Sequence, residues 1–138
     1  MAIEITADQN HYPIPASAIK KLINLISKTE AGRLPTSLSI VFLNNAAMRR
    51  VNKRFLKHDY PTDVISFDLS SENSIEGEIY IGLDQAAEQA QEYGVTLSNE
   101  ILRLSAHGFL HILGYDDNTV RKKNHMLKLG DDYISLLK

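Results

Sequence analysis

Apolar residues recur along this chain at two spacings, and each spacing predicts a different element. Alternating or short continuous apolar runs, which are typical of strands, occupy residues 3–5, 37–43, 64–69 and 76–81. Apolar residues three or four positions apart, which are typical of helices that bury one face, occupy about residues 15–27, 45–55, 84–93, 98–113 and 118–137. Four strands and five helices are therefore expected.

Residue types at the ends of the helical segments support these boundaries. Pro15 suits the first turn of a helix, Asp84 can cap the third helix, and Gly94 can end it in a left-handed turn. Either Asn44 or Asn45 can cap the second helix. The residues that this second helix should turn toward the core are Met48, Val51, Asn52 and Phe55.

The order of these elements predicts an α+β fold. Strands and helices do not alternate strictly, which favours one layer with a mixed four-stranded sheet packed against the five helices. A chain of 138 residues is the size of one domain, so residues 1–138 are expected to form a single unit that buries about two thirds of its unfolded surface. The composition, 43% hydrophobic and 23% charged, is that of a globular protein.

Composition also excludes several kinds of chemistry. The chain has no cysteine, so it has no disulfide framework, no thiolate zinc cluster and no thiol nucleophile. Any zinc or iron must rest on histidine and carboxylate. The first residues lack the basic segment followed by an apolar one that marks a signal peptide, and no apolar run approaches the length of a membrane span. A cytoplasmic protein without a membrane partner is expected.

The net charge of −2 conceals an uneven distribution of charge along the chain. Residues 31–58 contain no acidic residue, whereas residues 69–102 contain no lysine or arginine. A basic segment of this kind is most often a solvated helix face, but it can also hold phosphate groups locally. Its cations are Arg33, Arg49, Arg50, Lys53, Arg54 and Lys57.

The strongest chemical signal is the segment His107-Gly108-Phe109-Leu110-His111-Ile112-Leu113-Gly114-Tyr115-Asp116-Asp117. Its two histidines, four positions apart, project from one face of a helix, and Gly114 suits the end of that helix. The reversal of the chain would bring Asp116 or Asp117 toward the imidazoles. Two imidazoles and one carboxylate around a divalent ion are typical of a catalytic metal site, whereas a histidine on an apolar helix face is often only a core residue.

This segment resembles a signature of the YbeY family of bacterial metal-dependent endoribonucleases. The family motif is histidine-glycine-x-leucine-histidine-leucine-x-glycine-tyrosine-aspartate-histidine. Residues 107–117 match it at all but the last position, apart from an isoleucine for leucine at position 112. A second family segment, proline-threonine-aspartate/asparagine-valine-leucine-serine-phenylalanine, is similar to residues 61–67, and its glycine-acid-isoleucine strand is similar to residues 77–79. The resemblance extends over most of the chain in the same order.

By this resemblance His107 and His111 are metal ligands, and Asp117 stands where the family has its third histidine. We favour Asp117 over Asp116 as the third ligand for this reason. Exchanging a neutral imidazole for a carboxylate lowers the formal charge of a divalent site by one unit. Compared with a site of three histidines, this site should lower the pKa of a bound water by a smaller amount, and it should prefer harder metal ions. The resemblance implies one divalent ion, and zinc is the expected one.

The resemblance implies a metal-dependent endoribonuclease specific for single-stranded RNA, acting in 16S rRNA 3′-end maturation and ribosome quality control. Its partners would be rRNA and the ribosome or ribosomal proteins. The ion would lower the pKa of a water molecule and polarise a phosphoryl oxygen. Gly108 replaces the glutamate of histidine-glutamate-x-x-histidine metalloproteases, which argues against peptide hydrolysis. The residues expected to follow the RNA backbone are Arg49, Arg50, Lys53, Arg54 and Lys57.

The sequence leaves open which residue moves the proton. Glu78 and Asp63 are candidates if they reach the water, although Asp63 also suits a turn in which it bonds its own backbone. The family places an arginine where this chain has Leu56. Arg54, two residues earlier, is the candidate to fill the same space as a catalytic cation.

Two other functions fit part of the pattern. A non-haem iron oxygenase also uses two histidines and one carboxylate, but it normally carries them on barrel strands, whereas both histidines here share one helix. The other alternative is an RNA- or ribosome-binding module with a structural metal. Loss of RNA cleavage without loss of RNA binding, on removal of His111, would distinguish the enzyme from this module.

Overall fold

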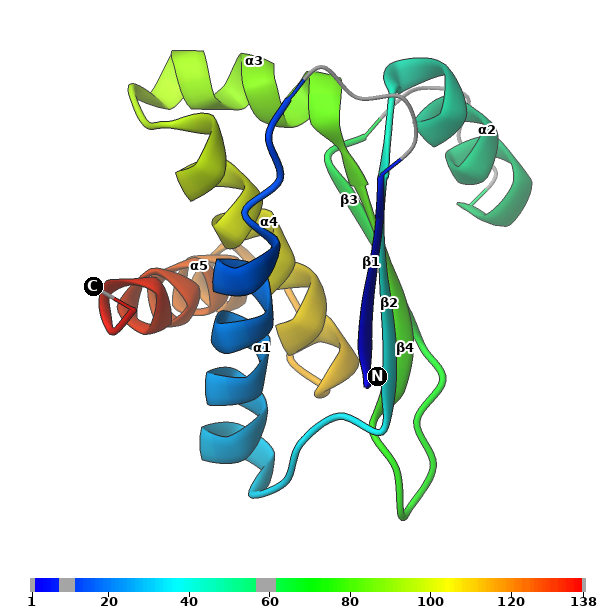
Figure 1. Ribbon diagram of the computed structural model, residues 1–138, viewed down its shortest axis with the longest axis vertical. Helices are drawn as coiled ribbons and strands as arrows, with labels where there is room; N and C mark the ends of the chain where they lie inside the picture. The colour runs from blue at the N-terminus through cyan, green and yellow to red at the C-terminus, as the bar shows by residue number, and fades with distance from the viewer. Residues whose placement is uncertain (1, 8–11, 57–61, 138) are drawn as a thin grey trace.

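The computed structural model describes residues 2–7, 12–56 and 62–137. Within these ranges it contains the expected four strands and five helices (Figure 1). No helix in them is long and apolar enough to cross a membrane. In chain order the elements are β1 (Ile3–Ala7), α1 (Ala16–Ala31), β2 (Ser37–Leu43), α2 (Asn45–Leu56), β3 (Val64–Asp68), β4 (Glu76–Gly82), α3 (Leu83–Tyr93), α4 (Leu97–Ile112) and α5 (Val120–Ser135).

The sheet is mixed, as the sequence predicted. Its strand order is β1-β2-β4-β3, in which β2 runs parallel to both β1 and β4, and β3 runs antiparallel to β4. A parallel pair needs a connection that returns to the starting end of the sheet, and α1 provides it between β1 and β2. The connection from β3 to β4 is the short polar segment 69–75. This arrangement places β3 at one edge of the sheet, where it contacts α4.

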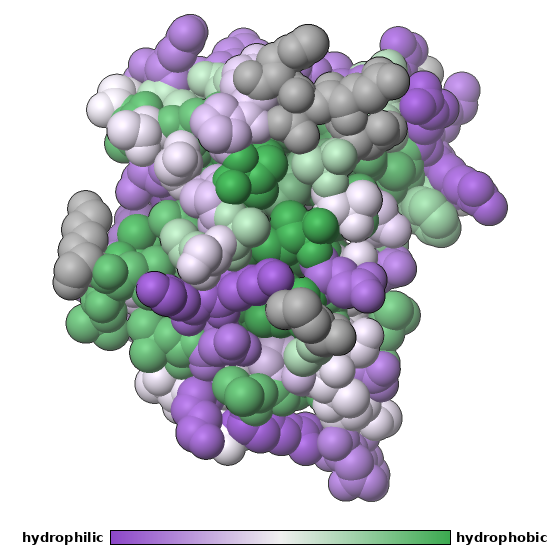
Figure 2. All heavy atoms as spheres, viewed as in Figure 1, coloured by the Kyte–Doolittle hydropathy of each residue, from purple (hydrophilic) through white to green (hydrophobic). Residues whose placement is uncertain are grey.

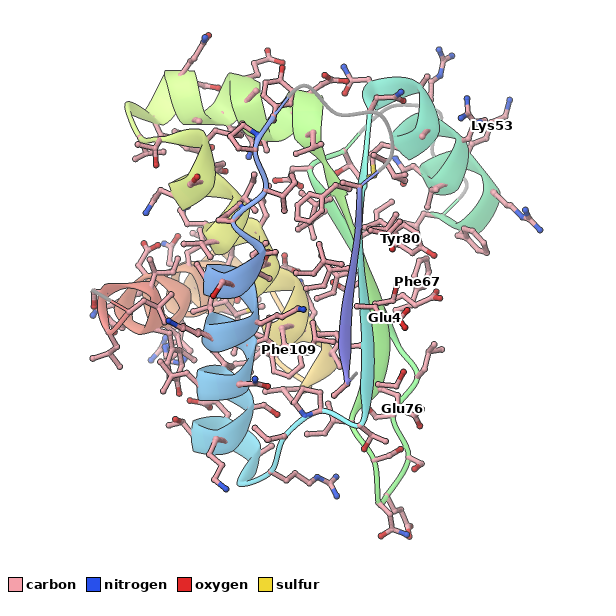
Figure 3. All side chains as sticks on the ribbon, in the orientation of Figure 1. Glu4, Lys53, Phe67, Glu76, Tyr80 and Phe109 are labelled. Carbon is pink, nitrogen blue, oxygen red and sulfur yellow. The ribbon has the colours of Figure 1, made fainter. Side chains whose placement is uncertain are left out.

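The two faces of the sheet have different surroundings. Helices α1 and α4 lie on one face (Figure 1), where Ile40 and Ile79 are fully buried. The buried ring of Phe109, from α4, lies on this side as well (Figure 3). Phe67 and Tyr80 project from the opposite face (Figure 3). The histidine helix α4 is thus the central element of the core, in contact with α1, α3, α5, β3 and β4.

Two glycines allow α4 to lie directly on the sheet. A Cβ atom at Gly108 would lie 2.9 Å from both the Oγ of Ser66 and a methyl carbon of Ile79. A Cβ atom at Gly77, on β4, would lie 2.6 Å from the side chain of Ile112. Because these separations are shorter than any normal contact, the close approach requires glycine at both positions. It also sets His107, next to Gly108, against the edge strand β3.

Several helix boundaries differ from those expected. Helix α1 continues to Ala31, four residues beyond the predicted end, and stops where Gly32 adopts a left-handed conformation with φ of 72°. Asp84 does not cap its own helix, which begins one residue earlier at Leu83. Its carboxylate instead accepts a hydrogen bond of 2.7 Å from the backbone N–H of Asn45, at the start of α2. Asp84 therefore ties the N-termini of two helices together.

The prediction that Phe55 faces the core is wrong. Met48 and Asn52 are buried as expected, but Phe55 is 53% exposed. Its ring meets the edge of Phe67 at a centroid separation of 5.4 Å. Phe67 projects from the sheet face opposite α1 and α4 (Figure 3), so the last turn of α2 packs outside the main core. The outward side of α2 forms a hydrophilic surface at the upper right of Figure 2.

Candidate metal centre

The two histidines of α4 lie one helical turn apart and turn toward the same point. The ring centroids of His107 and His111 are 4.8 Å apart, with the ring planes at 82°. The Nε2 atom of His107 lies 3.3 Å from the Oδ2 atom of Asp117, and the Nε2 atom of His111 lies 3.4 Å from that same oxygen. Three possible ligand atoms therefore converge, as the helical spacing and the following turn predicted.

A tight reversal after α4 brings Asp117 back to the histidines. Gly114 has φ of 104°, a conformation that is strained for any residue with a side chain. Its N–H donates to the carbonyl of His111 at 3.0 Å, and the N–H of Tyr115 donates to the carbonyl of Leu110 at 3.0 Å. These bonds satisfy the last carbonyls of the helix while the chain turns.

The turn presents Asp117 to the histidines and Asp116 to solvent. The carboxylate of Asp116 lies 3.5 Å from the ammonium group of Lys122 and accepts a hydrogen bond of 3.4 Å from the N–H of Asn118. Of the two carboxylates that the sequence offered, the structure therefore brings Asp117 into the group with His107 and His111.

A second set of contacts fixes the loop that carries Asp117. The hydroxyl of Tyr115 donates to Glu30, at the end of α1, over 2.6 Å. The hydroxyl of Tyr133, on α5, donates to the other oxygen of the same carboxylate. Burial, together with the bond to Glu30, raises the pKa of Tyr133 to about 12, so it remains a donor at neutral pH. One carboxylate from α1 thus links the metal-site loop to the last helix.

The three side chains fit a divalent metal ion. Ligands about 2.1 Å from a tetrahedral zinc ion lie about 3.4 Å from one another, which agrees with the measured separations of 3.3 and 3.4 Å between nitrogen and oxygen. These separations exceed the usual length of a hydrogen bond between such atoms. In addition, Nδ1 of His107 is buried and lacks a hydrogen-bond partner among the described residues. A neutral ring with its proton on Nδ1 leaves the Nε2 lone pair free for the ion.

Electrostatics favour the protonation states that a metal ion needs. Burial lowers the pKa of the His107 imidazole below its ordinary value, and the neighbouring His111 lowers it further, against the opposing effect of Asp117. Burial by itself would raise the pKa of the Asp117 carboxyl, but His111 and His107 outweigh it and hold this pKa below its ordinary value. Neutral imidazole and ionised carboxylate are the forms that bind metals.

This candidate metal centre lies in a cavity of about 550 Å³ between α4, β3 and the start of α5. Asp63 and Ser66 line it from the strand side, and Lys123 lines it from α5. Leu56, at the end of α2, also reaches it. The cavity extends along α4 beyond the histidines, so it has room for a substrate larger than the ion and a water molecule.

Of the predicted proton-transfer groups, the structure brings only Asp63 into this cavity. Its Oδ1 atom accepts a hydrogen bond of 2.8 Å from the N–H of Val64, which is the turn contact that the sequence suggested. Glu78 alternates with the buried Ile79 and so faces the opposite side of the sheet. There it accepts a hydrogen bond of 3.3 Å from the Tyr80 hydroxyl. Glu78 is therefore remote from the metal centre.

The predicted cations that the structure describes are also outside the cavity. Arg54 stacks over the ring of Phe55, with its guanidinium carbon 5.4 Å from the ring centroid, and does not fill the space beside Leu56. Arg49, Arg50 and Lys53 lie on α2 but are not among the described residues that line the cavity. Lys57 lies outside the described residues.

Among the cavity residues that sequence reasoning missed, Arg103 and Tyr93 lie together at one end of the cavity lining. Arg103 lies four positions before His107, so the helical spacing that relates the two histidines also relates this arginine to them. That spacing was a usable signal. Tyr93 ends α3, and nothing in the sequence indicates that the corner between α3 and α4 turns it toward the histidine helix.

Comparisons with known proteins agree with these features. A family model described as Endoribonuclease YbeY matches residues 4–138. A protein of that name from Chloroherpeton thalassium is 38% identical over 124 residues, covering 90% of this chain and 87% of the relative. Another from Bacillus licheniformis is 35% identical over 139 residues, covering 91% of this chain and 88% of the relative.

A solved structure shares the fold. The solution structure of TM1509 from Thermotoga maritima matches with a TM-score of 0.67 and 26% sequence identity, covering 96% of this chain and 86% of that protein. The similarity therefore spans the sheet, the helices and the segment that carries His107, His111 and Asp117.

Proposed function

We propose a metal-dependent reaction for this chain, which belongs to the YbeY family of endoribonucleases and is a hydrolase that acts on RNA. The proposed reaction depends on one divalent ion held by His107, His111 and Asp117. Zinc is the proposed ion, because two imidazoles and one carboxylate form a common catalytic zinc set. The observation that carries this proposal is the convergence of both Nε2 atoms on one oxygen of Asp117.

Each residue has a defined part in this proposal. His107 and His111 supply neutral nitrogen ligands from adjacent turns of a rigid helix, and Asp117 supplies the single negative charge. An ion held by these three side chains would supply Lewis-acid chemistry, which would activate a water molecule and polarise a phosphoryl oxygen. The imidazole of His107 is half-buried, which limits the access of bulk water on one side of the centre, and the RNA would enter through the cavity on the other side.

Asp63 is the proposed general base. Among the two carboxylates considered from the sequence, it is the one that lines the cavity with His107. One of its oxygens accepts from the backbone of Val64, which orients the carboxylate and leaves the other oxygen to receive a proton. Asp63→Asn should therefore lower the cleavage rate while leaving the stoichiometry of bound metal unchanged.

The proposed substrate is single-stranded RNA, and the proposed role is 16S rRNA 3′-end maturation and ribosome quality control in the cytoplasm. The exposed cations of α2 would hold the RNA backbone outside the cavity. A strand whose bases are unpaired can enter a cavity of about 550 Å³ more readily than a stiff duplex. Ribosomal proteins are the proposed protein partners. Family membership and the basic surface of α2 support this assignment.

The test compares two adjacent carboxylates. Zinc content and cleavage of a labelled single-stranded RNA are measured for the wild type, His111→Ala, Asp117→Asn and Asp116→Asn. The first two variants should lose both bound zinc and cleavage, and Asp116→Asn should retain both. RNA binding without cleavage by the zinc-loaded wild type would favour a binding module instead. Zinc retained by His111→Ala would contradict the site itself.

A further inference from the structure

A buried carboxylate holds an arginine in the cavity that contains the metal centre. Glu100 is only 1% exposed. Its Oε2 atom accepts a hydrogen bond of 2.7 Å from Gln89, and its Oε1 atom accepts one of 2.8 Å from Nη1 of Arg103. A buried charge is costly unless it is paired and hydrogen-bonded, so this contact keeps the guanidinium in one place. Arg103 is fixed before any substrate arrives.

Arg103 retains hydrogen-bonding capacity after these contacts. Its Nε atom lies 3.4 Å from the exposed carboxylate of Asp131, so the contacts with Glu100 and Asp131 engage Nη1 and Nε but not Nη2. Arginine presents its N–H groups in a fixed planar fork that matches two oxygens of a phosphate group. The free edge of Arg103 is therefore suited to a phosphate.

The guanidinium of this arginine lies over one face of an exposed aromatic ring, which leaves the other face for a base. The guanidinium carbon of Arg103 lies 5.3 Å from the ring centroid of Tyr93, and Tyr93 is 54% exposed. Both residues line the same cavity as the metal centre. An unpaired base of any type can stack on an aromatic ring. An exposed tyrosine next to a fixed arginine therefore offers a ring for the base and a guanidinium group for the phosphate of one nucleotide.

The position of this pair relates it to the reacting centre. Arg103 precedes His107 by one helical turn, which places their β-carbons about 5–6 Å apart. The cavity-lining part of α4, from Glu100 to Ile112, is about 18 Å long. A strand lying along it would pass the metal centre and then meet Arg103 and Tyr93.

We propose that Tyr93 and Arg103 form a nucleotide subsite, in which Tyr93 stacks one unpaired base and Arg103 binds a phosphate near the scissile one. This inference rests on the proposed function, because it concerns the RNA that the metal centre cleaves. It gives a defined role to one of the two cations, Arg103 and Lys123, that line the cavity. It also gives the preference for single strands a physical cause, since a base inside a duplex is already stacked and cannot lie on Tyr93.

Steady-state kinetics of the zinc-loaded enzyme on a short labelled RNA test the subsite. Tyr93→Leu should raise KM for a single strand at least about fivefold, the lower range of base stacking on an aromatic residue, with little change in kcat. Tyr93→Phe keeps the ring and should restore the wild-type KM. Removing one base at a time from the RNA should reveal one position at which the wild type loses affinity and Tyr93→Leu does not.

Salt dependence tests the role of Arg103. The slope of log kcat/KM against log salt should decrease in magnitude by about 0.7 for Arg103→Gln, the contribution of one neutralised phosphate on a single strand. Lys128→Gln, an exposed cation on α5 outside the cavity, should leave the slope unchanged. A merely structural arginine would lower the melting temperature without altering the slope, and that result would overturn the proposal.

The outcomes separate this inference from the proposed function. If the zinc-loaded wild type does not cleave RNA, the proposed function fails. If the wild type cleaves RNA but Tyr93→Leu has the wild-type KM for the intact RNA and for each RNA that lacks one base, the proposed subsite is wrong and the proposed function stands. Tyr93 is exposed, so this second variant remains informative even if Arg103→Gln proves too unstable to purify.

Discussion

At the scale of single residues, the carboxylate of Asp117 sets the character of the centre. In the proposed centre it is an anionic oxygen ligand among two neutral nitrogen ligands, and hard ions such as Mn²⁺ prefer oxygen. Its oxygen lies 3.3 and 3.4 Å from the two imidazole nitrogens, so the centre depends on this one short side chain reaching back across the turn.

Replacing Asp117 should change which ion the centre prefers. We expect Asp117→His to favour Zn²⁺ over Mn²⁺ more strongly than the wild type does, because it exchanges a hard oxygen for a softer nitrogen. Competition titrations of the two ions against a chelating indicator measure the ratio of affinities. Asp117→Asn, which removes the charge but keeps the size, should lose at least tenfold in affinity for both ions. An unchanged ratio in Asp117→His would contradict coordination by residue 117.

The partial burial of His107 predicts how the metal-free protein responds to acid. Because the pKa of His107 is lower in the folded chain than its ordinary value, the unfolded chain binds the proton more readily. Stability is therefore fully present above the ordinary histidine pKa of about 6.5 and decreases as the pH falls from there toward the folded value.

Urea unfolding of the metal-free protein at pH 7.5 and pH 5.5 measures this effect. The wild type should lose more stability between these two conditions than His107→Gln, which cannot take up the proton. Equal losses in the two proteins would show that His107 does not carry the effect.

The residues of the metal centre were predictable where helical spacing fixes geometry. Two histidines four positions apart had to share a face, and a glycine after them allowed Asp117 to return. The position of Glu78 was also within reach of the sequence, because it alternates with the apolar Ile79 and Ile81 and therefore points away from the core face of β4. Arg103 was within reach of the spacing argument, whereas Tyr93 depends on a corner between two helices that no local pattern encodes.

At the scale of elements, the loop between α4 and α5 has an anchor far away in sequence. Tyr115, two residues before Asp117, donates to Glu30 on α1, and Tyr133 on α5 donates to the same carboxylate. The two tyrosines therefore share a partner, but only Tyr115 lies on the loop that positions the metal ligand.

Because of this difference, substitution of Tyr133 is a control for substitution of Tyr115. Tyr115→Phe should weaken zinc binding by about tenfold, the lower range for residues that orient metal ligands, because the loop loses its tie to α1. Tyr133→Phe removes a similar hydrogen bond and should lower stability by a comparable amount with a smaller effect on zinc affinity. Calorimetric titration with zinc and thermal unfolding separate the two effects. Equal zinc affinities in both variants would contradict a role for the anchor.

The packing of α4 on the sheet predicts the cost of a single methyl group. Gly108→Ala should destabilise the protein by about 1–3 kcal/mol, because the new Cβ atom would lie 2.9 Å from Ser66 and Ile79. Gly130→Ala, in the middle of α5, meets its nearest neighbour at 3.4 Å and should be neutral or stabilising by up to about 1 kcal/mol. Chemical unfolding of both variants measures the difference. A neutral Gly108→Ala would show that α4 does not approach the sheet this closely.

Element types followed from the hydrophobic spacing, but the contacts between elements did not. The apolar spacing located all four strands and five helices, because burial of one face imposes the period of each element. Asp84 is an example of a contact between elements that the hydrophobic period does not predict. A capping residue next to a helix start was expected to serve that helix, yet its carboxylate binds Asn45 of another helix. Only the spatial adjacency of the two helix starts decides between them.

At the scale of the whole molecule, basic and catalytic surfaces occupy different elements. The cations of α2 lie outside the cavity, and Leu56 at the end of the same helix reaches it. An RNA strand that follows α2 toward its last turn would therefore meet the part of the cavity that Leu56 lines, so the two surfaces could act on one molecule.

Removing the cations of α2 should weaken RNA binding without affecting the metal. For the combined Arg50→Gln and Arg54→Gln variant, the slope of log affinity against log salt should decrease in magnitude by up to about 1.4, or about 0.7 for each phosphate that is no longer neutralised. Zinc content should stay at the wild-type level. Lys21→Gln with Lys28→Gln, on α1, removes the same charge elsewhere and should leave the slope unchanged. Equal slopes for the two double variants would indicate that α2 is only a solvated face.

Anomalous X-ray diffraction from crystals of the zinc-loaded protein, recorded on both sides of the zinc absorption edge, tests the central claim most directly. We expect one strong peak about 2.0–2.2 Å from Nε2 of His107, Nε2 of His111 and a carboxylate oxygen of Asp117. A peak bound by other residues, or no peak at these three side chains with zinc present in excess, would contradict the account.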